Sequence, residues 1–449
     1  MYVSVCIQCK KLLSRKNLNL TRKYTELFYN LMVPIFKRWL LRASIILSVI
    51  GPGIISGAAD NDAGGITTYS IVGAHYGYQM LWLLPLVGLV LWLTQDMGAR
   101  LGLVTGKGLA ALIRENFSIR LTVIVIVLTA ISNWMNIVAE FAGVASVAHL
   151  YHIPKTLLVA IAASAISFVV IKGNFQIVQR VFLTSSLLYL AYVIAGLKAN
   201  PDWAAIASGS FIPHFSMEHG FLFTAIALVG TTVTAWGQFF IQSYYVDKGV
   251  KDADIKLMRW DITAGTLWTI VVAFFIVVAT ASTLYPKGIQ INDAAQAAAA
   301  LEPFAGYLAK HLFAWGLLNA SLLGAGVVTI ATSYLITEAF GWEGKVDLGL
   351  RESPAFYKLF LFFIITAGLF VLIPSIPLVP TIVFSQALNA MVLPLLFICM
   401  MVLLNRKDIM GMKTNSRLNN VLVLAAILLV SALNVSYCYA LVSKFFKIL

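Results

Sequence analysis

Three consecutive polar residues, Asp60, Asn61 and Asp62, stand in an otherwise apolar stretch near the start of the chain. The surrounding segment 51–65, "GPGIISGAADNDAGG", is rich in glycine. Carboxylates are ligands for hard divalent cations such as Mg²⁺, and an unpaired carboxylate at membrane depth normally faces a cavity or a partner. Glycines that only pack helices together do not require adjacent carboxylates. The stretch therefore predicts a cation site at a break in a membrane helix.

The composition supports a membrane setting for this stretch. The chain has 449 residues, of which 60% are hydrophobic and 11% charged, and its mean hydropathy is +0.87. A soluble domain cannot bury that much apolar surface, whereas a bilayer solvates it. Because apolar runs of about 18 or more residues recur along the chain, helices are favoured over a barrel. We expect an all-α integral membrane protein.

About eleven crossings are predicted, and they form a transmembrane domain over 43–443 behind a basic tail, 1–42. The expected crossings are 44–72, 79–97, 121–148, 155–172, 176–196, 220–246, 262–284, 309–338, 357–375, 378–403 and 419–443.

The positive charge of the chain sets its predicted topology. With a cytoplasmic N-terminus, 26 of the 32 Lys and Arg residues lie inside. The six on the external side are Lys155, Lys198, Lys287, Lys310, Lys444 and Lys447. This positive-inside bias explains the net charge without nucleic-acid binding. We expect a multi-pass protein of a bacterial inner membrane, monomeric, with its N-terminus in the cytoplasm.

Two of the crossings contain an interruption. The first holds the acidic stretch, and the sixth, "ALVGTTVTAWGQFFIQS" at 227–243, holds Gly230, Gly237 and several threonines. Interrupted helices at corresponding positions predict an inverted repeat of five plus five crossings, over 43–197 and 220–404, with 419–443 outside it. In such a fold the substrate lies between the two breaks, where freed backbone carbonyls act as ligands.

Other motifs carry little functional weight. "CIQC" at 6–9 is a lone CxxC without a second pair or nearby histidines, so a chance pair is favoured over a metal or redox role. Cys399 and Cys438 lie in apolar segments and are expected in the core. No HExxH or GxSxG motif is present, so we do not expect an enzyme, nor a cofactor beyond a transported ion.

The quoted stretch and its continuation, "GPGIISGAADNDAGGITTYSIVGAHYGYQMLWLL", resemble the first two segments of the NRAMP divalent-metal transporters. Further matches are "RLGLVTGKGLA", "INDAAQAAAALEPFAG" and "SQALNAMVLPLLFICMMVLLNRKDIMG", so the resemblance covers about 44–443. It implies the LeuT-type fold with broken first and sixth helices, and transport of a divalent cation. The metal ligands it implies are the Asp62 side chain, the carbonyls of Ala59 and Thr232, and Gln386.

The sequence departs from the family at the metal site. The Asp-Pro-Gly-Asn motif of the family reads here from Asp62 to Gly65, so the aspartate is kept and the asparagine is lost. We expect the loss of the asparagine side chain at Gly65 to widen the site. The family's methionine in the sixth helix falls on Ala235. A thioether favours softer transition metals, and Mg²⁺ prefers carboxylates with retained waters. The pattern is similar to the NRAMP-related magnesium transporters, and we expect a largely hydrated Mg²⁺, with Mn²⁺ carried as well.

A second set of departures concerns proton coupling. The family's second histidine on the sixth helix aligns with Gln242, the third-segment aspartate is Ile137, and Lys358 is the cation nearest to the missing arginine pair. Glu140 and Gln242 are the candidate gating or relay residues. Because a proton relay needs a chain of titratable groups, we expect uptake that is not coupled to protons.

Several candidate roles stay open at this stage. Asp60 is a further candidate ligand, while Asn61 either lines the site or, like Asp60, caps the inner half-helix. Gln238 either holds a water or bonds to a neighbouring helix. The main alternative function is a proton-coupled Mn²⁺ or Fe²⁺ symporter. A second alternative is a Na⁺-coupled carrier of an organic substrate on the same fold, although the two carboxylates disfavour an anionic one.

Overall fold

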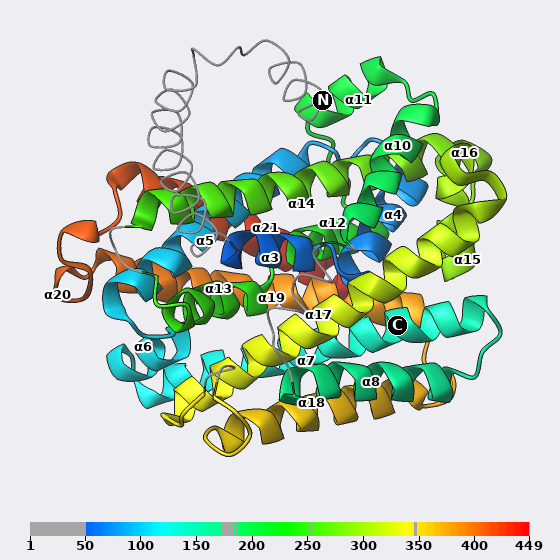
Figure 1. Ribbon diagram of the computed structural model, residues 1–449. Coiled ribbons are helices and arrows are strands. Elements are labelled where there is room, and N and C mark those ends of the chain that lie inside the picture. Colours follow the sequence, from blue (N-terminus) through cyan, green and yellow to red (C-terminus); the bar gives the residue numbers. More distant parts are fainter. Residues whose placement is uncertain (1–50, 173–183, 185, 251–253, 345–347, 449) are drawn as a thin grey trace, which may run out of the picture. The chain divides into compact units, whose positions relative to one another are not determined.

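Helices make up the fold, and no strand occurs among the residues that the computed structural model describes, 51–172, 184, 186–250, 254–344 and 348–448 (Figure 1). Pro52–Leu449 forms one compact unit, to which the following description applies. The expected tail 1–42, its CxxC pair and residues 176–183 and 185 of the predicted crossing 176–196 lie outside the described residues.

The first half of this unit contains α3 (Pro52–Ala59), α4 (Ala63–Tyr76), α5 (Leu83–Thr105), α6 (Leu109–Asn116), α7 (Ile119–Leu150), α8 (Lys155–Lys172), η1 (Ser186–Tyr189), α10 (Leu190–Lys198) and α11 (Trp203–Phe211). The second half contains α12 (His219–Thr232), α13 (Ala235–Asp247), α14 (Ile255–Thr283), α17 (Ala309–Phe340), α18 (Pro354–Leu372), α19 (Leu378–Asn405) and α21 (Arg417–Ile448). Short helices join the longer ones: η3 (Tyr285–Lys287), α15 (Ala294–Ala298), η4 (Ala299–Leu301), α16 (Glu302–Ala305), η5 (Gly306–Leu308), α20 (Lys407–Met410) and η6 (Gly411–Lys413).

Eight helical spans within the described residues are long and apolar enough to cross a membrane. Three of the eleven expected crossings are not among them, each for a visible reason. The first is divided into α3 and α4, and the fifth is described only from its second half onward. The second, α5, carries Asp96 and Arg100, which lower its hydropathy, and it continues to Thr105 rather than ending at 97.

Corresponding helices of the two halves make corresponding contacts. The broken pair α3 and α4 packs on α14, and α5 packs in the same way on the other broken pair, at α13. The third helices of the halves, α7 and α17, pack on each other, as do the fourth helices, α8 and α18. The cross contacts α7–α18 and α8–α17 complete the pattern (Figure 1). This arrangement is the one that an inverted repeat generates.

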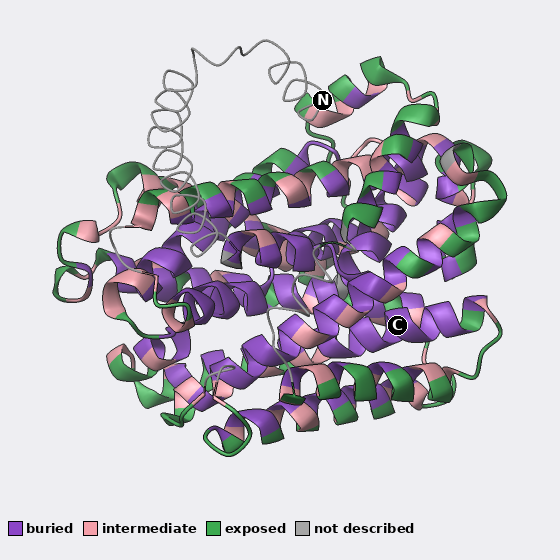
Figure 2. Ribbon diagram, viewed as in Figure 1, coloured by how far each residue is buried: buried purple, intermediate pink, exposed green. Residues whose placement is uncertain are grey.

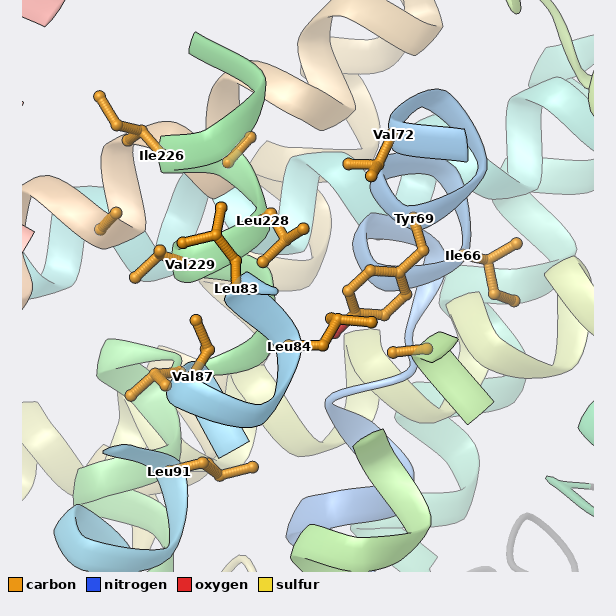
Figure 3. Packing of buried hydrophobic residues seen from close by; sticks show 14 of the residues in the cluster. Ile66, Tyr69, Val72, Leu83, Leu84, Val87, Leu91, Ile226, Leu228 and Val229 are labelled. Carbon is orange, nitrogen blue, oxygen red and sulfur yellow. The ribbon is translucent and has the colours of Figure 1, made fainter. Parts of the chain in front are cut away.

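Figure 2 shows that the helices that carry the breaks consist mostly of buried residues, whereas exposed residues lie on the outer helices. Many of these exposed residues are large and apolar. Figure 3 shows α4, α5 and α12 packing around Tyr69, Val72, Leu83, Leu84, Val87, Ile226 and Leu228. On the outer helices, Phe168 of α8 is 66% exposed and Leu369 of α18 is 61% exposed. Such side chains are poorly solvated in water, whereas lipid accommodates them. Cys399 is buried as expected, whereas Cys438 of α21 is exposed, so the expectation of a core position for Cys438 is wrong.

Candidate cation-binding site

The first break separates α3 from α4 by three non-helical residues, Asp60, Asn61 and Asp62. Asp62 has extended backbone angles (φ −70°, ψ −169°) and is the N-cap of α4, where its Oδ1 accepts a hydrogen bond from the Gly65 amide at 2.8 Å. An aspartate is a favoured N-cap because its carboxylate pairs with an otherwise unpartnered amide. At the end of α3, the Ser56 and Ala58 carbonyls accept from the Asp60 and Asn61 amides. The Ala59 carbonyl loses the Ala63 amide, its partner in a continuous helix, because that amide donates to Glu140 Oε2.

The second break consists of Val233 and Thr234, between α12 and α13. The Thr234 hydroxyl oxygen accepts from the Gly237 amide at 3.2 Å and caps α13. The same hydroxyl donates to Asp60 Oδ1 at 3.4 Å. This contact joins two positions 174 residues apart in the chain. The two interrupted helices therefore meet at their breaks, as the sequence pattern predicts.

The polar side chains of the first break are sealed from solvent. Asp60 and Asn61 are 0% exposed and Asp62 is 2% exposed. Asn61 donates to the Gly57 carbonyl at 3.4 Å, but its Oδ1 and the Oδ2 of Asp60 are buried without a hydrogen-bond partner. Native proteins leave few buried polar atoms unpaired, and each such atom needs an explanation. A cation that brings its own water ligands would satisfy both oxygens.

Glu140 of α7 reaches the same break. Its Oε2 accepts from the Ala63 amide at 3.3 Å, and its carboxyl group lies beside that of Asp62. Gly324 of α17 leaves the room for this arrangement, since a Cβ there would lie 2.5 Å from the Glu140 carboxyl carbon. Two carboxyl groups bond to each other only when one of them holds a proton.

Gln386 of α19 lies against the start of α4. A Cβ placed on Gly64 would come within 2.0 Å of Gln386 Nε2, so only glycine permits this approach. The amide donates to Ser385 Oγ at 3.0 Å, and its Oε1 is buried without a hydrogen-bond partner. Gln386 therefore presents a free oxygen at the break where the sequence reasoning places a ligand.

Gly65 does not leave the open space that its missing side chain predicts. A Cβ at this position would lie 2.7 Å from the carbonyl oxygen of Asp60 and 3.4 Å from Tyr69 Cε2. The volume expected to widen the site is thus filled by backbone. The expectation of vacated volume at Gly65 is wrong for this conformation, and the Asp60 carbonyl becomes an additional candidate oxygen ligand.

Three of the remaining predicted residues of the sixth helix lie at its break, and Gln242 does not. Thr232, Ala235 and Gln238 are 0% exposed and lie at or within one turn of the break. The Thr232 hydroxyl is 2.9 Å from the Tyr69 hydroxyl and donates to Leu228 O at 2.8 Å. Gln238 Nε2 donates to Thr234 O at 3.4 Å, within its own helix, and its Oε1 is unpartnered.

Gln242 lies away from the break and contacts the link between α5 and α6. It lies a further turn along α13, and its amide donates to the carbonyl of Lys107 at 2.8 Å, in the link between α5 and α6. The structure therefore does not bring this candidate relay residue to the break. Trp236, next to Ala235 in α13, is fully buried beside Phe240.

Two residues of the site escaped the sequence reasoning. Thr234 could have been predicted from the sequence, because a threonine at a helix interruption is a good N-cap and its hydroxyl is an oxygen ligand. Asn389 of α19 accepts from the Ala235 amide at 3.1 Å and lies three residues after Gln386. That spacing puts both on one helix face, which is the only hint the sequence offers.

The donor set of the site is dominated by oxygen. Among the described residues, no three His, Cys, Asp or Glu side chains group together to hold a metal. A cation at the breaks would instead combine Asp60 and Asp62 with backbone carbonyls, the Thr234 hydroxyl, the Gln386 amide oxygen and water. Neither break contains a methionine or a cysteine.

Comparison with known families gives one match that covers most of the chain. The profile of the family described as "Natural resistance-associated macrophage protein-like" (Nramp) matches residues 53–440. Among curated proteins, the chain is 25% identical over 402 residues to the divalent metal cation transporter MntH of Deinococcus radiodurans, covering 87% of this chain and 89% of that protein. The MntH of Acidiphilium cryptum is 26% identical over 377 residues, covering 80% and 83%.

Solved structures share the fold. A manganese transporter of Eremococcus coleocola superposes with a TM-score of 0.71 at 20% identity, covering 89% of this chain and 88% of that one. Mhp1, a nucleobase-cation-symport-1 family transporter, superposes with a TM-score of 0.57 at 13% identity over 87% and 90%. At these identities the likeness concerns the fold, which is the LeuT-type fold expected from the sequence.

Proposed function

Because the chain belongs to the natural resistance-associated macrophage protein-like family, we propose that it carries divalent metal cations across the membrane that it spans many times. The observation that supports this best is the contact between the two breaks through Asp60 and Thr234, beside buried oxygens without partners. The similar MntH proteins are named as divalent metal cation transporters. The fold alone does not select the substrate, since Mhp1 shares it.

The preferred ion in this proposal is Mg²⁺, with Mn²⁺ as a second substrate. The donors at the breaks are carboxylates, carbonyls, a hydroxyl and an amide oxygen, which are the ligands of hard cations. Ala235 supplies no sulfur, so nothing at this position favours softer metals. Since Asp60 and Asp62 are the acidic residues of the breaks, a Mg²⁺ that keeps several waters suits the site.

The proposed driving force is the membrane potential. Gln242, which aligns with a titratable residue of the family, is tied to Lys107 and lies away from the break. Glu140 is the titratable side chain that α7 brings to the first break. A divalent cation moving inward through 100 mV gains about 4.6 kcal/mol, twice the value of about 2.3 for one charge. This gain is enough for accumulation without a second ion.

A second candidate function is a proton-coupled manganese symporter. The Asp62 and Glu140 carboxyl groups lie beside each other, which favours this function, because one proton can bridge such a pair. A cation bound at Asp62 would compete with this proton. One of the similar solved structures is that of a manganese transporter.

Ion flux into liposomes separates the two candidates. Purified full-length protein is reconstituted, and entry of Mg²⁺, entry of Mn²⁺ and internal pH are recorded in the same vesicles. The proposal expects Mg²⁺ entry without internal acidification. Mn²⁺ entry with acidification and no Mg²⁺ entry would replace it with the symporter, and no flux of either metal would overturn both.

The cellular setting completes the proposal. The MntH relatives are bacterial proteins, and the positive-inside bias supports an N-terminus in the cytoplasm. We therefore propose a monomer in a bacterial inner membrane, with transport directed into the cytoplasm.

A further inference from the structure

We propose that Asn389 is a positioning residue that holds the two halves of the broken sixth helix in register for the ion. The inference rests on the proposed function, because it assigns Asn389 a role at the same cation site. Asn389 is 0% exposed and lies in the middle of α19, which packs against α12 and α13.

The Asn389 side chain bonds to both sides of the break. Its Nδ2 donates to the carbonyl of Gly230 in α12 at 3.0 Å. Its Oδ1 accepts from the amide of Ala235, the first residue of α13, at 3.1 Å. One amide group thus bridges two backbone groups that belong to different helices.

These two bonds replace bonds that the break removes. In a continuous α-helix, the Gly230 carbonyl would accept from the amide of residue 234, and the Ala235 amide would donate to the carbonyl of residue 231. Asn389 donates to the Gly230 carbonyl before the break and accepts from the Ala235 amide after it. The carbonyls of Thr231 and Thr232 then stand at the open end of α12, where helix carbonyls lack amide partners. These are the oxygens left for a cation.

The Asn389 side chain is itself held in place. Ser132 of α7 donates its hydroxyl hydrogen to the same Oδ1 at 3.1 Å. The backbones of α12 and α19 touch, since a Cβ on Gly230 would lie 1.9 Å from the Gln386 carbonyl oxygen. Gln386, three residues earlier on α19, lies against the first break at Gly64. A single face of α19 therefore contacts both breaks.

The first test compares Asn389→Leu with Asn434→Leu as the matched control. Asn434 of α21 donates to Ala390 O of α19 at 3.2 Å, so it also bonds to α19 but contacts neither break. The substitution at Asn389 strands a buried amide and a buried carbonyl at the ion site. In proteoliposomes normalised for folded protein, we expect KM for Mg²⁺ to rise about 10-fold or more in Asn389→Leu and to stay unchanged in Asn434→Leu.

The second test uses Ala235→Pro, which removes the amide that Asn389 binds. Ala235 is the first residue of α13, and Thr234 before it is extended (φ −94°, ψ 144°), so proline fits there without breaking the helix. If Asn389 acts through this amide, the two changes are not independent. The KM increase of the double variant should fall clearly below the product of the two single increases.

The outcomes distinguish the inference from the function that underlies it. Absence of divalent flux in the wild type would overturn the proposed function itself. Flux in the wild type with an unchanged KM in Asn389→Leu, and only a smaller amount of folded protein, would overturn the positioning role. A double variant whose KM increase equals the product of the single increases would also overturn it.

Discussion

The side chains at the two breaks offer oxygen atoms as ligands and no sulfur. Asp60, Asp62, Thr234 and Gln386 offer carboxylate, hydroxyl and amide oxygens, and Ala235 ends at its methyl group. Oxygen donors suit hard cations, and thioethers suit softer ones. A single sulfur atom introduced at the second break should therefore change which ion the site prefers.

Ala235→Met should shift the preference from Mg²⁺ toward Mn²⁺ and Cd²⁺, because the thioether adds a soft ligand. The measurement is competition between the three ions for uptake into proteoliposomes. Ala235→Leu is the matched control, since it adds similar bulk without sulfur to a fully buried position. An equal change of preference in both variants would assign the effect to size and contradict the ligand argument.

Gly65→Ala should destabilise the protein and slow transport. The added Cβ would lie 2.7 Å from the Asp60 carbonyl oxygen, which belongs to the backbone of the break. Overpacking of this kind costs about 1–3 kcal/mol. Gly316→Ala is the control, because a Cβ at this helical glycine of α17 meets nothing within 4 Å. Thermal unfolding and flux are measured, and equal melting temperatures for the two variants would show that the break is roomier than described.

The sequence predicted the residue types of the site better than their contacts. The acidic stretch, the glycines and Gln386 were found from composition and resemblance. The filling of the space at Gly65 was not, because it depends on where the Asp60 carbonyl points. Asn389 was missed because its partners, Gly230 and Ala235, are 159 and 154 residues away in the chain.

At the scale of helices, α3 is fastened to α14 at its N-terminal end. Asp261 Oδ2 accepts from the Gly53 amide at 2.8 Å and from the Tyr245 hydroxyl at 2.9 Å, and its Oδ1 accepts from the Ile54 amide at 3.2 Å. A carboxylate at a helix N-terminus pairs with free amides and with the positive end of the helix dipole. Release of α3 therefore requires breaking these bonds.

Asp261→Ala should loosen α3 and expose the residues behind it. The reporter is a cysteine at Ser56, which is 0% exposed, in a background without native cysteines. A loss of about 1–2 kcal/mol corresponds to a change of about 5–30-fold in the open population, and labelling by a thiol reagent should accelerate accordingly. Tyr245→Phe removes one of the three bonds and should give a smaller effect. Equal labelling rates in Asp261→Ala and the parent would contradict the fastening role.

The sequence predicted the ends of a helix correctly where proline, glycine or polar residues mark them. The crossing predicted at 155–172 is α8, which starts directly after Pro154. Both interruptions lie where glycine and polar residues predicted them. The extension of α5 to Thr105 was missed because Asp96 and Arg100 look unsuitable for a membrane. Their ion pair at 2.8 Å and the second pair of Asp96 with Arg259, also at 2.8 Å, make the extension acceptable.

At the scale of the whole transport unit, the breaks are enclosed by helices of both halves. The α7 helix brings Glu140, α19 brings Gln386 and Asn389, and α13 brings Thr234 as its cap. In this conformation the acidic residues are closed to solvent. A cation that enters such a site carries two charges across the membrane field when no counter-ion is exchanged.

Transport should therefore depend on voltage. With Mg²⁺ outside and a potassium gradient that sets the potential, an inside-negative potential should accelerate initial uptake, and an inside-positive one should suppress it. The driving force changes by about 4.6 kcal/mol per 100 mV, twice the value of about 2.3 for one charge. Uptake that is indifferent to the potential would contradict uncoupled transport.

Calorimetric titration of the purified full-length protein with Mg²⁺ tests the central claim, that a divalent cation binds at the two breaks, most directly. Asp62→Asn removes one charge and keeps an N-cap for α4, because asparagine caps helices as well as aspartate does. Asp202→Asn is the control, since Asp202 caps α11 through the Ala204 and Ala205 amides, both at 3.0 Å. We predict saturable Mg²⁺ binding in the wild type and in Asp202→Asn, and binding weakened about 10-fold or more in Asp62→Asn. Equal Mg²⁺ affinity in all three proteins would contradict the account.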